Sequence, residues 1–363
     1  MPDTKPTSRF TVDLDALAAN HATLAGEARG AEVAAMLKAN AYGLGKTPVA
    51  LRLRSCGVRS FFTAGVLGAE ALREVLGPEP DIYVLDGCRP GDASRLLAAD
   101  LTPVLNSPEQ VAVWRDAASG RGPLSAALHV DTGMNRLGLR PEQAEDLARS
   151  NTDLAGVQVS LVMSHLACGD EPGHPMNARQ LALFSQARAL FPEARASFAN
   201  SGGVFLGPEH HFDMVRPGIS MFGGGPFGRP DPRIAAVGTL EAEILQVREV
   251  PRGETVGYAA SFTADAPRTI ATVGIGYADG VLRSNQPRAQ VWMAGELRAV
   301  VGRISMDTMA VDVTGTGARP GDFVELFGEN LAVDDAAAAA GTISYELLTS
   351  VGSRVERRLR DRV

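Results

Sequence analysis

Short apolar runs that recur along the chain constrain its fold more than any other feature. Eight of them have the length of a buried strand, and helix-length segments separate them. The runs are Val33–Leu37, Phe61–Ala64, Ile82–Leu85, Leu101–Leu105, Ala126–Val130, Val157–Ser164, Ala196–Ala199 and Met214–Val215. Strands that alternate with helices form parallel sheets, and eight of them favour a closed barrel over an open sheet. We therefore predict a (β/α)8 barrel of the TIM type.

A different pattern follows the glycine- and proline-rich residues 223–232. Apolar and polar residues alternate there and turns are frequent, which is typical of antiparallel strands. The expected strands are Leu240–Val250, Thr255–Tyr258, Thr269–Gly276, Ala289–Met293, Met309–Val313 and Asp322–Leu326. Helices are expected near Asp334–Ala340 and Ser344–Val351. We predict a barrel domain over residues 1–235 and a mainly antiparallel β domain over residues 236–363.

The two ends of the chain carry weaker signals. Phe10–Leu14 alternates like a short strand, and Asp13 or Asp15 can cap a helix after it. Arg354–Arg362 is expected to be a solvated, partly frayed terminus. The first nine residues are polar and lack the apolar segment of a secretory signal. No apolar stretch reaches the roughly 18 residues of a membrane span.

Composition narrows the range of partners. The formal net charge of −7 argues against a nucleic-acid surface, which is normally basic. Cys56, Cys88 and Cys168 lie far apart without the spacing of metal ligands, so we expect reduced thiols and no metal site. These features predict a cytoplasmic protein without a nucleic-acid or membrane partner.

Lys38 stands where the first apolar run ends, and Asn40, Gly43 and Gly45 mark a turn after it. Desolvation at such a position lowers the pKa of a lysine amine and frees it for imine chemistry. A lysine whose stem follows the strand end while its amine reaches water is the alternative. Tyr42 follows, with a hydroxyl that can bond a phosphate near the turn.

Other polar residues also follow apolar runs, and the loops at the carboxyl ends of barrel strands converge on one mouth. Arg136 lies between two glycines and suits a carboxylate clamp, although a solvated loop arginine is the alternative. His165 ends the sixth run, where a structural histidine is more common than a catalyst. Residues 200–203 and 216–219 follow the last two runs, where barrel enzymes often bind phosphate.

Two segments, Lys38-Ala39-Asn40-Ala41-Tyr42-Gly43 and Gly276-Tyr277-Ala278-Asp279-Gly280, closely resemble motifs of the alanine racemase family. The resemblance covers nearly the whole chain, in the order that the family uses. It implies the barrel, the β domain and pyridoxal 5'-phosphate (PLP) as the cofactor. It also implies a homodimer in which each active site lies at a barrel mouth and is completed by the partner's β domain. The implied reaction interconverts L-alanine and D-alanine and supplies D-alanine for peptidoglycan.

The resemblance implies roles residue by residue. Lys38 looks like the lysine that forms a Schiff base with PLP and like the base on one face of the substrate Cα. Tyr258 of the partner subunit looks like the acid/base on the opposite face. Arg216 matches the residue that faces the pyridine nitrogen, and His165 matches the residue hydrogen-bonded to that arginine. The positions that match the phosphate site are Tyr42, Ser201, Gly218 and Ile219, with Asn200 beside them.

Substrate positions are implied in the same way. Arg136 matches the residue near the substrate carboxylate and the cofactor's phenolic oxygen. Met306 of the partner subunit matches the residue whose backbone N–H meets that carboxylate, with Asp307 beside it. Tyr277, Arg283 and Arg303 match the access corridor.

Two positions depart from the family pattern. His129 stands where many members have a lysine, carbamylated in some, so we predict no carbamate and expect chloride or a nearby carboxylate beside Arg136. Ser353 stands where a tyrosine commonly bonds the phosphate. The smaller residue implies a wider entrance and admits serine or larger substrates besides alanine.

Two other functions compete with the racemase. PLP-dependent decarboxylases of similar architecture place a glutamate at the pyridine nitrogen and use a cysteine of the partner chain. Here Arg216 takes the first position, and all three cysteines precede the β domain. Non-catalytic PLP-carrier proteins resemble only the barrel and lack a second domain.

Overall fold

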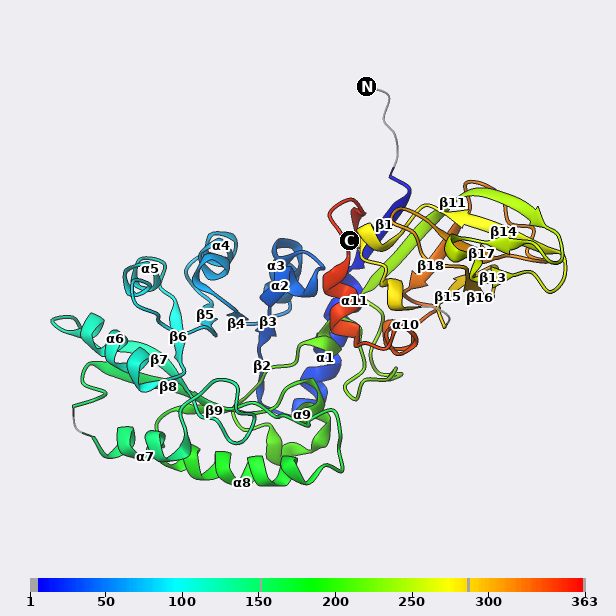
Figure 1. Ribbon diagram of the computed structural model, residues 1–363. Coiled ribbons are helices and arrows are strands. Elements are labelled where there is room, and N and C mark those ends of the chain that lie inside the picture. The colour runs from blue at the N-terminus through cyan, green and yellow to red at the C-terminus, as the bar shows by residue number, and fades with distance from the viewer. Residues whose placement is uncertain (1–5, 151, 286–287, 362–363) are drawn as a thin grey trace. The chain divides into compact units, whose positions relative to one another are not determined.

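We describe a computed structural model of the chain, over residues 6–150, 152–285 and 288–361 (Figure 1). It divides into two compact units. The barrel unit comprises residues 20–41 and 45–221, and the sheet unit comprises residues 1–19, 42–44 and 222–363. The predicted domain boundary at residue 235 stays a prediction. Within the described ranges, no helix is long and apolar enough to cross a membrane.

The barrel unit is built on one parallel sheet whose first strand is interrupted at Ala34. The sheet order is β2 (Glu32–Val33), β10 (Met214–Val215), β9 (Arg195–Ser197), β8 (Val157–Met163), β7 (Leu124–His129), β6 (Thr102–Leu105), β5 (Asp81–Val84), β4 (Ser60–Thr63) and β3 (Ala35–Met36). β2 and β3 are successive parts of one strand, which pairs with β10 on one side and with β4 on the other. The ring therefore closes with eight strands, and the predicted (β/α)8 barrel is confirmed.

Helices separate these strands along the chain. They are α1 (Leu14–Ala28), α2 (Lys38–Tyr42), α3 (Lys46–Ser55), α4 (Val66–Leu76), α5 (Ala93–Ala98), α6 (Pro108–Ala118), α7 (Pro141–Arg149), α8 (Pro175–Ala189) and α9 (Ser201–Leu206). A proline opens each of α6, α7 and α8, where its fixed φ favours the first helical turn and its missing N–H costs nothing. Every residue of β4 is buried, as expected for a parallel strand covered on both faces.

The sheet unit contains an eight-stranded, mostly antiparallel sheet. Its order is β14 (Arg268–Val273), β17 (Met309–Asp312), β16 (Glu296–Val301), β15 (Gln290–Met293), β18 (Phe323–Phe327), β11 (Gly238–Val250), β1 (Ser8–Asp13) and β19 (Glu356–Arg360). β11 also pairs with β14, so six of the strands form a ring. The short β12 (Thr255–Val256) and β13 (Phe262–Thr263) pair separately. The predicted antiparallel β domain is confirmed.

The two ends of the chain join this sheet together. β1 pairs antiparallel with β11, and β19 pairs parallel with β1. The prediction of a frayed C-terminal tail was therefore wrong for residues 356–360. Asp13 fixes the junction, because its Oδ1 accepts the N–H groups of Asp15 and Ala16 at 2.9 Å while its other oxygen binds Arg360.

Two helices and a buried carboxylate complete the sheet unit. They are α10 (Val333–Ala340) and α11 (Ser344–Ser350), close to the two predicted helices. Asp334 accepts the backbone N–H of Gly225 at 2.8 Å and the hydroxyl of Ser344. The glycine-rich stretch is thereby held against α10.

Candidate active site

A cavity of about 210 Å³ lies at the carboxyl ends of the barrel strands. Its lining consists of Met36, Lys38, Ala64, Leu85, Asp86, His129, Arg136, Leu137, Met163, His165 and Arg216. Most of these residues end a strand or follow one closely, as the geometry of a barrel mouth requires. Four residues selected from the sequence, Lys38, Arg136, His165 and Arg216, are thus brought to one site.

Lys38 stands between the end of β3 and a strained turn. Burial, and then the positive charge of Arg136, lower the pKa of its amine. The following four residues, Ala39 to Tyr42, all have left-handed φ values of 49° to 55°. Each costs on the order of 1 kcal/mol, and such strain concentrates at functional sites. Asn40 supports the turn, because its Oδ1 accepts the N–H of Lys46 at 2.8 Å and its carbonyl accepts that of Gly45.

Arg216 is buried at the cavity wall. Its guanidinium donates to the hydroxyl of Ser197 and to the carbonyl of Ser164. Burial lowers its pKa to about 9, which still leaves it cationic at neutral pH. The same cavity makes His165 neutral, because burial, and then the charges of Arg216 and Arg136, hold its pKa well below the ordinary value. Among the described residues, the predicted hydrogen bond between His165 and Arg216 is not formed.

The loops after the last two barrel strands are joined by Ser201. Its hydroxyl oxygen accepts the backbone N–H groups of Gly218 at 3.0 Å and of Ser220 at 3.2 Å. Asn200 caps α9, with its Oδ1 accepting the N–H of Gly203 at 3.0 Å. The hydroxyl of Ser220 is buried and bonds to none of the described residues. The hydroxyl groups of Ser201 and Ser220 therefore lie on linked loops at the place where barrels commonly bind phosphate.

His129 is held by a residue that we did not select from the sequence. Its Nδ1 lies 2.8 Å from Oδ1 of Asn106, while the amide nitrogen of Asn106 donates to the carbonyls of Leu85 and Val104 at 2.9 and 2.8 Å. Burial, and then the charge of Arg216, lower the pKa of His129 to about 4, so the ring is neutral. Asn106 directly follows β6, and this position was the signal that could have identified it.

Arg136 lies on a loop shaped by Asp131. One carboxylate oxygen of Asp131 accepts the backbone N–H groups of Gly133, Met134 and Asn135 at 2.9 to 3.1 Å. This oxygen therefore builds the turn that precedes Arg136. Among the described residues, no carboxylate forms an ion pair with Arg136, so the carboxylate expected beside it is not found there.

Tyr258, Tyr277 and Met306 lie on the sheet unit with exposed side chains, at 70%, 42% and 53% of their full accessibility. Their segments are neighbours, because the N–H of Tyr277 donates to the carbonyl of Ser305 and that of Ala278 to the carbonyl of Met306. The segment before Tyr258 lies against Gly302, since a Cβ on that glycine would lie 2.6 Å from the carbonyl oxygen of Val256. Clustered exposed side chains of this size mark an interaction surface.

The remaining predicted residues also lie on the sheet unit. Tyr42 is buried, with its ring centre 4.7 Å from that of Phe222 and 5.8 Å from that of Tyr345, and burial raises its pKa. Asp307 is bound by Arg354 at 2.8 Å, and Asp279 is bound by the same guanidinium at 2.9 Å. Ser353 is exposed in the turn before β19. The corridor residues Arg283 and Arg303 are found in η5 (Arg283–Asn285) and beside Gly302.

These features define a barrel protein with a desolvated lysine and a buried arginine at the carboxyl ends of its strands. Two loops with hydroxyl groups suited to a phosphate follow the last two strands. Family comparison agrees with that class. Residues 12–226 match the alanine racemase N-terminal domain, and residues 237–359 match the alanine racemase C-terminal domain. The chain belongs to the alanine racemase family.

Individual relatives are similar over almost their full length. The chain is 47% identical to an alanine racemase of Rhizobium meliloti (strain 1021), over 96% of each chain. It is 44% identical to a catabolic alanine racemase of Agrobacterium fabrum, over 96% of this chain and 91% of the relative. A crystal structure of alanine racemase from Bartonella henselae with covalently bound pyridoxal phosphate superposes with a TM-score of 0.92 at 37% identity, covering 98% of this chain and 100% of that one.

Proposed function

We propose that the protein is an isomerase that interconverts L-alanine and D-alanine with PLP as its cofactor. The observation that carries this proposal is the single mouth cavity that joins the desolvated Lys38 to Arg216 and Arg136. The family assignment supports alanine racemase activity, and the Bartonella henselae relative supports the cofactor.

The residues present fit PLP. Lys38 offers an amine of lowered pKa for the aldehyde carbon, and Arg216 offers a fixed guanidinium for the ring nitrogen. Ser201, Gly218 and Ile219 would hold the phosphate, and the buried hydroxyl of Ser220 is a further donor without a protein partner among the described residues. When bound, PLP withdraws electrons from the amino-acid Cα and so makes its proton acidic.

Two residues would move the Cα proton. The lowered pKa of Lys38 favours its neutral amine, which can accept a proton from one face of Cα. Tyr258 is mostly exposed on its own unit, so its hydroxyl is available to the barrel of a partner subunit and to the opposite face of Cα. This arrangement makes a homodimer the working form, with Met306 and Asp307 also reaching the partner's site.

Two arginines would set the course of the reaction. Arg216 keeps its own proton because a guanidinium is a very weak acid, so it binds the ring nitrogen without protonating it. With its ring nitrogen unprotonated, the cofactor would draw less negative charge from Cα, which would favour rapid return of a proton to that carbon. Arg136 carries a fork of N–H groups that suits the substrate carboxylate.

Chiral chromatography of the products from L-alanine and L-serine, in parallel reactions, tests the function. Approach to equal amounts of the alanine enantiomers, much faster than for serine, is the expected result. Comparable rates would instead establish an alanine/serine racemase with an entrance widened at Ser353. Absence of D-product from both would refute the racemase and favour a PLP-carrier protein.

The cellular role and location are separate questions. The Agrobacterium fabrum relative is described as catabolic, so supply of D-alanine for peptidoglycan is one of two roles that the chemistry serves. Growth of a deletion strain with and without D-alanine distinguishes them, because only loss of a biosynthetic enzyme creates a D-alanine requirement. The thiols of Cys56, Cys88 and Cys168 are free, which is compatible with the predicted cytoplasmic location.

A further inference from the structure

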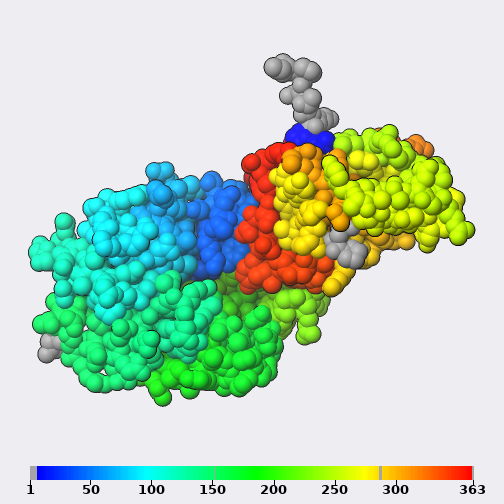
Figure 2. All heavy atoms as spheres, in the orientation of Figure 1, coloured from blue at the N-terminus to red at the C-terminus, as the bar shows by residue number. Residues whose placement is uncertain are grey.

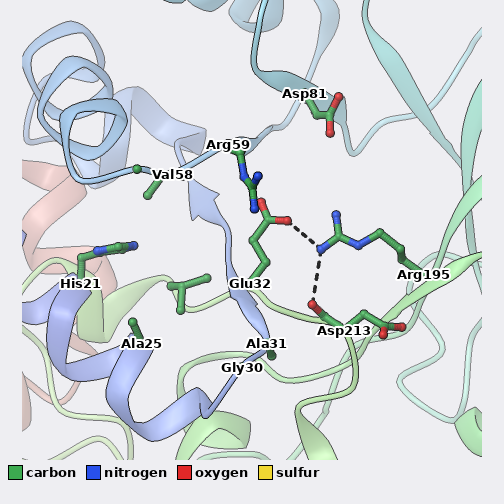
Figure 3. A pocket seen from close by; sticks show the side chains of 12 residues that line it. His21, Ala25, Gly30, Ala31, Glu32, Val58, Arg59, Asp81, Arg195 and Asp213 are labelled. Atoms are coloured by element: carbon green, nitrogen blue, oxygen red, sulfur yellow. Dashed lines mark hydrogen bonds and ion pairs between the residues drawn. The ribbon is translucent and has the colours of Figure 1, made fainter.

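A second and larger cavity, of about 630 Å³, lies at the amino ends of the same barrel strands (Figure 3). Parallel strands place their amino and carboxyl ends on opposite sides of a barrel, so this cavity is distinct from the one that Lys38 lines. Its volume lies within the roughly 300–1,000 Å³ of small-molecule sites. None of the residues used in the proposed function lines it.

Charged side chains reach this cavity from several elements. Glu32 opens β2, Asp81 opens β5, Arg195 opens β9, and Arg59 directly precedes β4. Figure 3 shows their side chains pointing toward one shared space. The lining therefore offers positive and negative groups together, rather than a charge of one sign.

Only part of this charge is paired within the protein. Arg195 binds Oε2 of Glu32 at 2.6 Å and the carbonyl of Asp213 at 3.3 Å. The other carboxylate oxygen, Oε1 of Glu32, is buried without a hydrogen-bond partner among the described residues. A buried carboxylate oxygen left unpaired is costly, so a donor brought by a ligand would be bound strongly.

Two further charged groups line the same cavity. Within the described part of the chain, neither the carboxylate of Asp81 nor the guanidinium of Arg59 makes a hydrogen bond or an ion pair. Burial, and then the negative charge of Glu32, raise the pKa of Asp81, and the positive charges of Arg195 and Arg73 offset these effects only in part. A ligand ammonium would suit Glu32 and Asp81, while Arg59 would suit a carboxylate.

The other wall of the cavity is apolar. Ala25, Val33 and Val58 line it, beside His21, whose pKa is lowered by burial and whose ring is therefore neutral. An aliphatic side chain can be buried against this wall while the charged groups of the same molecule meet the charged wall.

We propose that the amino-end cavity binds a free α-amino acid with an aliphatic side chain, as its zwitterion. The ammonium lies between Glu32 and Asp81, the carboxylate meets Arg59, and the side chain packs on Ala25 and Val58. A molecule that carries only one of the two charges leaves one partner unpaired and binds more weakly.

Calorimetric titration of the holoenzyme with L-leucine tests this site. Isoamylamine and 4-methylpentanoate, which lack the carboxylate and the ammonium respectively, serve as comparison ligands. The visible absorption of the cofactor is followed in parallel, because binding at the Lys38 cavity would change it. We expect saturable binding of L-leucine that leaves the spectrum unchanged, with both comparison ligands roughly tenfold weaker or more.

Variants locate the binding. Arg59→Gln and Asp81→Asn remove groups without a hydrogen-bonded partner in the described chain, so both should fold, keep racemase activity and bind L-leucine roughly tenfold more weakly or worse. Arg121→Gln, an exposed arginine elsewhere on the barrel unit, should bind as the parent does. Equal binding by all three variants, or equal binding of isoamylamine and L-leucine, would overturn the proposal. Active enzyme without leucine binding would overturn it and leave the proposed function standing.

Discussion

Replacing Asn106 by leucine should release His129 from its present orientation. The amide nitrogen of Asn106 lies within 2.9 Å of two carbonyls, so its oxygen must be the atom that faces His129. A carbonyl oxygen only accepts, and therefore Nδ1 of His129 carries the proton. The neutral ring then presents Nε2 as a hydrogen-bond acceptor at the wall of the mouth cavity.

The magnitude follows from the groups that the leucine side chain cannot satisfy. Asn106→Leu leaves Nδ1 of His129 and the carbonyls of Leu85 and Val104 without their partner. Each buried unpaired group costs about 1–3 kcal/mol, although relaxation and water entry lower the sum. We expect the free energy of unfolding to fall by about 3 kcal/mol. Asn106→Asp is the matched control, because its carboxylate still accepts from Nδ1 but cannot donate to the carbonyls.

Two measurements check this reasoning. Urea unfolding at equal protein and PLP concentrations gives the stability change, since cofactor and subunit concentration both affect apparent stability. Long-range ¹H–¹⁵N NMR of labelled histidine reports which ring nitrogen carries the proton. Loss of less than about 0.5 kcal/mol in Asn106→Leu, or a parent His129 protonated at Nε2, would refute the argument.

Three further predictions concern other parts of the molecule. Lys38→Ala should abolish racemisation of L-alanine and remove the absorption of the lysine–PLP linkage, while an unaltered spectrum would place that linkage elsewhere. Ser201→Ala should weaken PLP binding by roughly tenfold, measured by equilibrium dialysis, because the loop anchored on Gly218 and Ser220 loses its acceptor. Burial of Asp13 opposes its ionisation, but the N–H of Ala16 and the guanidinium of Arg360 outweigh burial and lower its pKa. That stabilisation is present above the unfolded pKa near ~4 and is lost as the pH falls through the folded value. Asp13→Asn should therefore lower the unfolding free energy by up to about 1 kcal/mol at pH 7 and by nothing at low pH, whereas a constant difference would contradict the assignment.

The barrel could be predicted because its strands are buried on both faces. Such strands read as continuous apolar runs, as Phe61–Phe62 and Leu161–Met163 do. The interruption of the first strand at Ala34 could not be predicted, since it depends on β10 and β4 pairing with different parts of that strand.

The C-terminal strand, unlike the barrel strands, could not be predicted from the sequence. Residues 356–360 read Glu-Arg-Arg-Leu-Arg, without the alternation of a half-buried strand. They become β19 because the N-terminal β1 offers its free edge, and because Arg360 reaches Asp13. A contact between the two ends of a chain leaves no local signal, so a polar tail was misread as frayed.

Some residues of the mouth cavity could also be predicted from the sequence, and others could not. Lys38, Arg136, His165 and Arg216 could be found because each follows a strand, and the barrel brings such positions together. Asn106 also follows a strand, but asparagine is common in loops, so its position alone did not mark it as a site residue. Only the structure shows its hydrogen bond to His129. Ser220 could not be selected from the sequence, because its hydroxyl is distinguished only by being buried without a hydrogen-bond partner among the described residues.

One strand connects the two cavities of the barrel. The chain from Glu32 to Met36 starts at the charged amino-end cavity and leads directly to Lys38 at the mouth. Arg195 ties the start of this strand to β9, while the left-handed turn supported by Asn40 holds its far end. The lysine is thus placed by a strand fixed at both ends. Preorganisation of this kind is required of a group that must meet one face of a substrate carbon. It also makes Glu32 the position at which an amino acid bound in the amino-end cavity would act on the segment that carries Lys38.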